Sequence, residues 1–273
     1  MSDHITIGLV QMTSSNDVAG NTAVAQSLIE DAARAGAEFV LTPEMTGLME
    51  IRREPLLEKI REEPNDLCLK MLRDSARTLG IWLLIGSLAI KIDDEWVANR
   101  SFLIDPDGEI RARYDKIHMF DVDLPDGESY RESKLYHAGT EPVVANLPSV
   151  KLGMTICYDL RFPYLFRAMA LKGAGIIAVP SAFTKVTGEA HWHTLLQARA
   201  IETGSYILAP AQGGRHVMGR DTYGHSLVVD PWGRILADGG EKPGITIQRL
   251  DLKEVDRTRQ KIPSLSHTKK LGS

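Results

Sequence analysis

Two cysteines occur in this chain of 273 residues, and their sequence contexts suggest different roles. Cys68 falls on the apolar stripe of an expected helix, which is typical of a core thiol. Cys157 follows the strand-like segment KLGMTI and precedes YDLRFP, so we expect it at the carboxyl end of a strand. Backbone N–H groups of a turn at such a place could stabilise a thiolate or an oxyanion, which would suit a nucleophile. The alternative is that Cys157 is an ordinary buried strand residue.

A free thiol has a pKa of about 8.5 and needs a base or a positive neighbour to react well at neutral pH. Lys116, in the segment YDKIH, is expected at the end of a second strand, and Glu44 follows Pro43 at the end of a third. Each residue alone is typical of solvated surface charge. The three would form a thiol hydrolase site if the strands are neighbours, which the local patterns leave open.

Strand and helix patterns alternate along the chain and indicate one domain of mixed sheet and helix layers. We expect a helix around 24–32 that stops at Gly36, further helices over 68–79, 163–172 and 188–203, and a hairpin pair around 230–233. The expected strands cover 5–10, 38–41, 81–90, 96–104, 109–117, 143–147, 151–157, 176–179, 206–211 and 245–250. Residues 121–139 read as a polar loop. We place the domain at 1–263 and a tail at 264–273.

The segments ARAGAEFVLTPEM (33–45) and ALKGAGIIAVPSA (170–182) resemble each other faintly. Each has a helix end, Gly-Ala, a short apolar strand and a proline. Two similar halves would explain this likeness, but any helix–glycine–strand unit of an α/β protein has the same pattern.

Composition and charge exclude several classes of protein. Apolar residues make up 43% of the chain, and a formal charge of -4 comes from acidic and basic residues that are mixed along the sequence. We therefore expect no nucleic-acid partner. The apolar runs are too short to span a bilayer, and MSDHITIGLVQM lacks the features of a signal peptide, so we expect no membrane association and a cytoplasmic location. Two cysteines are too few for a disulfide framework.

Three motifs, LTPEM, YDKIHMFD and GMTICYDLRFP, resemble in order and separation those of the nitrilase or carbon–nitrogen hydrolase superfamily. The likeness runs from Ile5 to about residue 263. It implies an α/β fold of four layers, an α-β-β-α sandwich with two mixed sheets flanked by helices. It also implies that Glu44 is the general base, Cys157 the nucleophile and Lys116 the group that stabilises the tetrahedral intermediate. Glu132, in RESK, matches a second family glutamate that positions the lysine and substrate; otherwise it is a loop-surface acid.

The same resemblance implies amide hydrolysis through a thioester on Cys157, with release of ammonia and with no metal or organic cofactor. The backbone N–H of Tyr158 would join Lys116 in binding the oxyanion. His191 and His193 lie two positions apart on an expected helix and therefore point about 200° apart. We interpret them as surface or packing histidines and not as a metal pair.

Details of the motifs bear on the substrate. The Tyr-Asp pair after the cysteine resembles the amidase branches, whereas nitrilases more often have Trp-Glu. The segments PSAFTKVTGEAHWHTLLQARAIET, APAQGGRH and YGHSLVVDPWG are similar to the deaminated-glutathione amidase branch, and next to the ω-amidases. The expected partners are water and a small α-keto-acid amide, either deaminated glutathione or α-ketoglutaramate. An aliphatic amide or N-carbamoyl hydrolase, a catalytically silent binding protein and a papain-like Cys–His site are the alternatives.

A substrate carboxylate requires cationic or hydroxyl partners. The candidates are Arg161, Thr184, Arg199, Arg215 and Tyr223. Arg161 and Arg199 would also suit structural ion pairs. Similar proteins commonly dimerise through the tail and the helices after the cysteine, so we expect a homodimer, although SLSHTKKLGS departs from the usual aromatic-ending tail.

Overall fold

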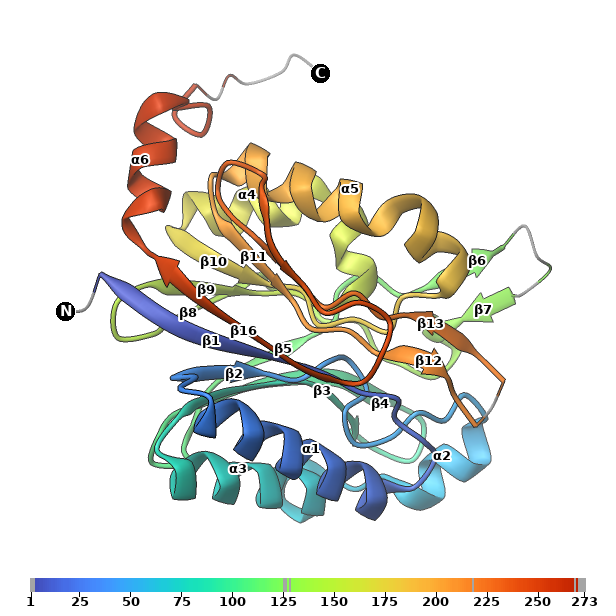
Figure 1. Ribbon diagram of the computed structural model, residues 1–273. Coiled ribbons are helices and arrows are strands. Elements are labelled where there is room, and N and C mark those ends of the chain that lie inside the picture. The colour runs from blue at the N-terminus through green and yellow to red at the C-terminus, as the bar shows by residue number, and fades with distance from the viewer. Residues whose placement is uncertain (1–2, 125–126, 128, 218, 268, 270–273) are drawn as a thin grey trace.

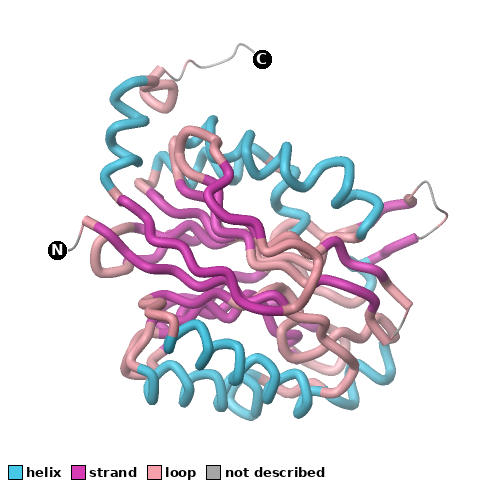
Figure 2. The backbone as a smooth tube through the Cα atoms, viewed as in Figure 1, coloured by secondary structure: helices cyan, strands magenta, loops and turns pink. Residues whose placement is uncertain are grey.

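Two six-stranded sheets pack face to face and are covered on their outer sides by helices in this computed structural model (Figure 1). The structure describes residues 3–124, 127, 129–217, 219–267 and 269. Helices α1 (Val18–Arg34) and α3 (Leu67–Leu79) cover one sheet, and α4 (Pro163–Leu171) and α5 (Lys185–Thr203) cover the other. Figure 2 shows the two strand layers between these outer helices. The expected four-layer α-β-β-α sandwich is confirmed.

Each sheet is of mixed type, with parallel strands at its centre. The first sheet has the order β16 (Gly244–Asp251), β1 (His4–Gln11), β2 (Phe39–Leu41), β3 (Trp82–Lys91), β4 (Val97–Ile104) and β5 (Ile110–Asp115). The second has the order β15 (Ile235–Asp238), β14 (Leu227–Val229), β11 (Tyr206–Ala209), β10 (Ala174–Ala178), β9 (Lys151–Met154) and β8 (Val143–Asn146). Strands β2 and β10 are each parallel to both neighbours. Strands β2 and β10 lie in the two similar sequence segments, 33–45 and 170–182. Each is therefore an interior strand of its own sheet.

Side-chain alternation along the strands divides the apolar residues between two cores. In β2, Phe39 and Leu41 belong to the core between the sheets. Val40, which points the opposite way, packs in the core beneath α1 and α3 with Ile29 and Leu72. Because a strand buried on both faces needs apolar residues at every position, this segment reads as a continuous apolar run.

Helix α3 places Cys68 in the core beneath the first sheet, as its apolar stripe predicts. The helix begins at the N-cap Asp66, whose side chain accepts the backbone N–H of Leu69 at 2.7 Å. It ends at Gly80, which adopts the left-handed conformation (φ 64°) that a helix C-terminus favours. Burial raises the pKa of the Cys68 thiol to about 12.

Some expectations were wrong in detail. The expected polar loop at 121–139 contains the hairpin of β6 (Asp121–Asp123) and β7 (Ser129–Arg131), followed by a 3-10 helix (Glu132–Lys134). These strands are largely exposed, so they lack the apolar pattern of a buried strand. A second short hairpin, β12 (Gly213–Arg215) and β13 (Asp221–Tyr223), was also unexpected.

Three short helices had no expected counterpart. They are α2 (Arg53–Lys59), a 3-10 helix (Glu63–Asn65) and α6 (Lys253–Lys261). In α6 only Val255 and Thr258 are buried, so its sequence shows almost no apolar stripe. In the part of the chain that the structure describes, no helix combines the length and apolar character needed to cross a membrane.

Candidate active site

Strand ends from both sheets bring Glu44, Lys116 and Cys157 together. Strand β4 is antiparallel to both β3 and β5, so β5 runs in the same direction as β2 and β3. Glu44 and Lys116 therefore follow β2 and β5 at the same edge of the first sheet. Cys157 comes from the facing sheet, three residues after β9. The strand is shorter than expected, and Cys157 instead begins a 3-10 helix (Cys157–Arg161).

The Lys116 ammonium lies between two carboxylates. Its Nζ is 3.0 Å from Oε1 of Glu44, and 3.0 and 2.8 Å from Oε1 and Oε2 of Glu132. Lys116 is 2% exposed and Glu44 is 3% exposed, so these charges are removed from water. A buried ion pair is stable only where hydrogen bonds satisfy its remaining polar atoms.

Neutral donors complete the hydrogen bonding of the two carboxylates. The Asn99 Nδ2 group donates to Oε1 of Glu44 at 3.0 Å and to Oε1 of Glu132 at 3.2 Å. The Ala182 backbone N–H donates to Oε2 of Glu44 at 2.8 Å, and the Phe120 N–H donates to Oε2 of Glu132 at 2.7 Å. Both carboxylates are thus held at fixed positions around the ammonium.

The electrostatics keep Glu44 ionised and Cys157 protonated at neutral pH. Burial is the largest single influence and acts to raise the pKa of Glu44, but the charge and hydrogen bond of Lys116, together with Cys157 and Arg220, outweigh it, so the pKa is lowered from 4.5. Burial also acts to lower the pKa of Lys116, yet the charges of Glu132 and Glu44 hold it well above 10.5. Burial and then the charge of Glu44 raise the pKa of the Cys157 thiol, which hydrogen-bonds Glu44. The arrangement is a thiol beside a carboxylate base and not a preformed thiolate.

The backbone at Cys157 is held in a strained conformation. Its φ of 47° lies in the left-handed region, which is uncommon for residues other than glycine. The Cys157 N–H donates to the Pro180 carbonyl at 2.9 Å. The buried Asp159 carboxylate accepts the Ile156 N–H at 2.9 Å and the Tyr114 hydroxyl at 2.7 Å. These bonds from both sheets direct the thiol toward Glu44, as backbone strain at reactive sites often does.

A cavity opens onto the thiol. Its lining includes Glu44, Lys116, Cys157 and Glu132. Aromatic and polar side chains also line it: Phe120, Tyr130, Tyr136, Tyr158, Phe183, Thr184, Thr187 and Arg220. Among the described residues that line it there is no histidine. This lining gives no support to a papain-like Cys–His pair.

The predicted carboxylate-binding residues are dispersed. Thr184 lines the cavity and is hydrogen-bonded to Thr187 at 2.8 Å. The other four candidates do not line it. Arg161 packs over Phe183 with its guanidinium 5.3 Å from the ring centroid.

Three of the candidates have partners elsewhere. Arg199 is buried and donates to the Leu160 carbonyl at 2.9 Å, which fits its structural alternative. Arg215 is exposed, and Tyr223 stacks on His225 with ring centroids 4.4 Å apart.

Two residues of the site were missed from the sequence. Asn99 interrupts the buried strand β4, and a polar residue inside an apolar strand was the available signal. Arg220 lies in a polar, glycine-containing loop that gave no such signal. Its guanidinium donates to the Ala182 carbonyl and packs over the Tyr130 ring at 5.1 Å. Its buried Nε has no hydrogen-bond partner among the described residues.

A buried carboxylate, ammonium and thiol at the meeting edges of two sheets define an enzyme site of the cysteine hydrolase class. The chain matches the carbon–nitrogen hydrolase family over residues 6–260, and it belongs to that family. The expected superfamily is therefore confirmed.

Individual relatives are similar to this chain both in sequence and in structure. The chain is 41% identical to the deaminated glutathione amidase of Synechocystis sp., with 94% of this chain and 96% of that protein aligned. It is 39% identical to the deaminated glutathione amidase of Mus musculus, covering 96% and 82%. The nitrilase and fragile histidine triad fusion protein NitFhit of Caenorhabditis elegans has a TM-score of 0.90 at 38% identity; the match covers 97% of this chain and 65% of that one.

An amidase of the nitrilase superfamily from Nesterenkonia sp. AN1 has a TM-score of 0.80 at 28% identity. The match covers 95% of this chain and 98% of that one. That structure is of a glutamate-to-glutamine mutant of the amidase, and it shows the result of Michael addition of acrylamide at the active-site cysteine.

Replacing Lys116 by methionine is expected to lower the free energy of unfolding at pH 7 by about 3–5 kcal/mol, because two buried carboxylates lose their counter-charge. The pKa of Glu44 is lowered in the folded protein. The contribution of Lys116 is thus present above about pH 4.5 and is lost as the pH falls through that lowered pKa. Urea unfolding should therefore show a constant deficit from pH 7 to about pH 4.5 and a deficit that shrinks as the pH is lowered further, to about pH 3.

The matched control is Lys91→Met, which removes a surface ammonium that pairs with Asp94 at 2.6 Å. Little change is expected for this variant. A Lys116→Met deficit that is as small as that of the control, or that is constant over the pH range, would contradict the ion-pair account.

Proposed function

We propose that this enzyme hydrolyses the side-chain amide of an α-keto acid, with deaminated glutathione as the preferred substrate. The released product is the amine that the amide carries: a dipeptide amine from deaminated glutathione, or ammonia from α-ketoglutaramate. The observation that carries the amidase chemistry is that Cys157, Glu44 and Lys116 line one cavity, with the Lys116 ammonium 3.0 Å from the Glu44 carboxylate. The names of the relatives, at 38–41% identity, support the particular substrate.

In the first half-reaction Cys157 is the nucleophile and Glu44 the general base. Glu44 accepts the thiol proton as sulfur bonds to the amide carbonyl carbon. The Lys116 ammonium and the Tyr158 backbone N–H stabilise the resulting oxyanion. When the carbon–nitrogen bond breaks, Glu44 transfers the proton to the leaving nitrogen. The amine departs (the dipeptide from deaminated glutathione, ammonia from a primary amide), and a thioester on Cys157 remains.

Water completes the reaction. Glu44 takes a proton from water as the oxygen attacks the thioester, and a second oxyanion occupies the same position near Lys116. Collapse breaks the carbon–sulfur bond, releases a carboxylic acid and returns the proton to the thiol. Glu132 is a positioning residue here, because it holds the ammonium through two contacts. None of these steps uses a metal or organic cofactor.

Arg220 is our candidate for binding the substrate carboxylate. It lines the cavity, and its buried Nε lacks a partner among the described residues. An unsatisfied buried donor is costly, and a ligand carboxylate would satisfy it with a charge-assisted hydrogen bond. Thr184 also lines the cavity and offers a hydroxyl donor. Arg220 thus replaces Arg215 as the arginine of this loop that we assign to substrate binding.

Steady-state assays of deaminated glutathione against α-ketoglutaramate, an N-carbamoyl compound and a simple aliphatic amide test the proposal. We expect the highest kcat/KM for deaminated glutathione and, by mass spectrometry, an acyl adduct on Cys157. Cys157→Ala should abolish both adduct and turnover. Cys68→Ala removes the other buried thiol and should leave turnover intact. A large preference for α-ketoglutaramate would instead assign an ω-amidase, and absence of turnover on every amide would favour a silent binding protein.

Replacing Arg220 by glutamine is expected to lower kcat/KM for the keto-acid substrate by about 10–150-fold, the equivalent of about 1.5–3 kcal/mol for a lost charge-assisted hydrogen bond. Hydrolysis of a simple neutral amide should change little, which separates carboxylate binding from an indirect effect on Glu44. The control, Arg215→Gln, alters an exposed arginine of the same loop. If both substrates lose activity equally, Arg220 has only a structural role.

We also propose a cytoplasmic homodimer. The support for the location is that Cys68 and Cys157 are both free thiols, which suits a reducing compartment. The support for assembly is a set of exposed apolar side chains on α4, on α5 and near the β14–β15 turn, namely Tyr164, Leu171, Ile201 and Trp232. Part of the tail, 268 and 270–273, lies outside the described residues. Light scattering on the purified chain measures the assembly state.

A further inference from the structure

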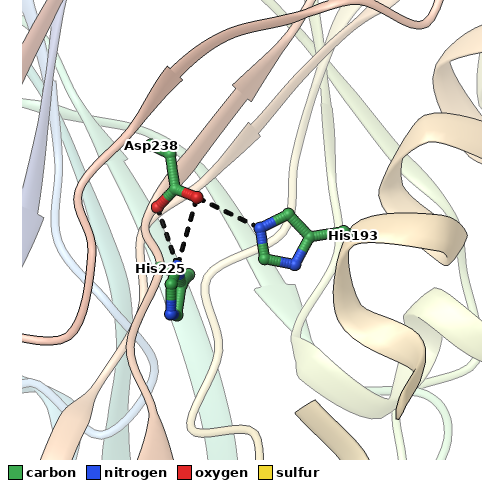
Figure 3. A group of neighbouring side chains, drawn as sticks. All are labelled: His193, His225 and Asp238. Atoms are coloured by element: carbon green, nitrogen blue, oxygen red, sulfur yellow. Dashed lines mark hydrogen bonds and ion pairs between the residues drawn. The ribbon is translucent and has the colours of Figure 1, made fainter. Parts of the chain in front are cut away.

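Two histidines and an aspartate from three separate elements converge on the second sheet, outside the active-site cavity (Figure 3). His193 belongs to α5, His225 precedes β14, and Asp238 ends β15. The His193 Nε2 atom is 3.1 Å from Oδ2 of Asp238. The His225 Nδ1 atom is 2.9 Å from Oδ1 and 3.1 Å from Oδ2 of the same carboxylate.

The three side chains are held in this arrangement by their surroundings. His225 has a φ of 54°, in the left-handed region that is uncommon for residues other than glycine. Its N–H donates to the Gly240 carbonyl at 2.6 Å, and its carbonyl accepts the Trp192 indole N–H at 2.9 Å. The Gly240 N–H donates to Oδ1 of Asp238 at 2.8 Å. These bonds fix the backbone that carries His225, and the Gly240 N–H orients the Asp238 carboxylate, as hydrogen bonds to ligating carboxylates do at metal sites.

We propose that His193, His225 and Asp238 bind a divalent transition-metal ion of the zinc class. One ligand atom from each residue lies within 4.8 Å of the others. Donors about 2.0–2.1 Å from a tetrahedral zinc ion are about 3.3 Å apart, so the two histidine–carboxylate distances need little adjustment. Imidazole nitrogens with a carboxylate oxygen are ligands that zinc accepts, and three protein ligands leave a fourth position for water.

Access and charge are consistent with binding. The side chains of His193, His225 and Asp238 are 30%, 20% and 34% exposed, so an ion can reach them from solvent. Each histidine would bind through the nitrogen that now faces Asp238, and would lose the proton on that nitrogen as the metal binds. The competing explanation is a purely structural cluster in which both imidazoles donate hydrogen bonds to the carboxylate.

A metal here would join α5 to the strands beneath it. Thr184 and Thr187, at the start of α5, line the active-site cavity, while His193 lies two turns further along the same helix. The ion would therefore stabilise the position of a helix that forms one wall of the cavity. None of the three ligands lines that cavity, so the site is separate from the amidase chemistry and does not depend on it.

Titration calorimetry with zinc alone tests the proposal, in the wild-type chain and in a Cys157→Ala background that removes the active-site thiol as a ligand. We expect one saturable site in both, a higher Tm with zinc, and visible d–d absorption of tetrahedral geometry with cobalt. His193→Ala and Asp238→Asn should each weaken binding at least tenfold. The matched control is His191→Ala, which alters an exposed histidine two residues away whose ring contacts Arg161.

Two results would overturn the inference. One is that the folded wild-type chain binds zinc no more tightly than about 0.1 mM, the range of weak adventitious binding. The other is that His193→Ala, shown by circular dichroism to be folded, binds zinc as tightly as His191→Ala. In that second case the metal sits elsewhere and the three side chains form only a hydrogen-bonded cluster. Neither result bears on amide turnover.

Discussion

A single buried ammonium lies between two carboxylates where the two sheets meet, and the geometry of the site depends on that ion pair. Lys116 is 2% exposed, so its charge is sustained by Glu44 and Glu132 and not by water. Two carboxylates around one ammonium leave an excess negative charge, which must be met by dipoles. Asn99 and the backbone N–H groups of Ala182 and Phe120 provide them, and each comes from a different part of the chain. The ion pair therefore requires several elements to fold together.

This requirement explains why the site bridges the sandwich. The first sheet holds Lys116 and Glu44 after parallel strands, whereas the Ala182 N–H and Cys157 come from the second sheet. Because an α-β-β-α sandwich packs its sheets through a rigid apolar core, their relative position is fixed by residues such as Leu41 and Ile177. The distance from thiol to base is thus a property of the whole core. If both groups lay on one surface loop, that distance would be less rigidly fixed.

Local pattern was sufficient for most of the fold and for part of the site. A short continuous apolar run located β2, and Glu44 follows its carboxyl end. The resemblance to a family added the partnership of Glu44, Lys116 and Cys157. Short exposed strands such as β6 were missed because solvent on both sides leaves no apolar period. Arg220 was missed because its role at the site depends on how its loop folds against the cavity. That placement results from contacts between residues that are distant in sequence.

The two thiols show why burial alone does not identify a nucleophile. Both Cys68 and Cys157 are buried, and burial raises the pKa of each. An electropositive pocket with a preformed thiolate would have lowered the pKa of one of them. Here the reactive difference is the neighbour, since Cys157 contacts an ionised carboxylate and Cys68 contacts Thr22. In the proposed mechanism the thiol stays neutral until a carbonyl carbon is present to accept the sulfur electrons as Glu44 takes the proton. Lys116 then stabilises the charge that has moved to the carbonyl oxygen, so proton removal and bond formation are coupled by geometry.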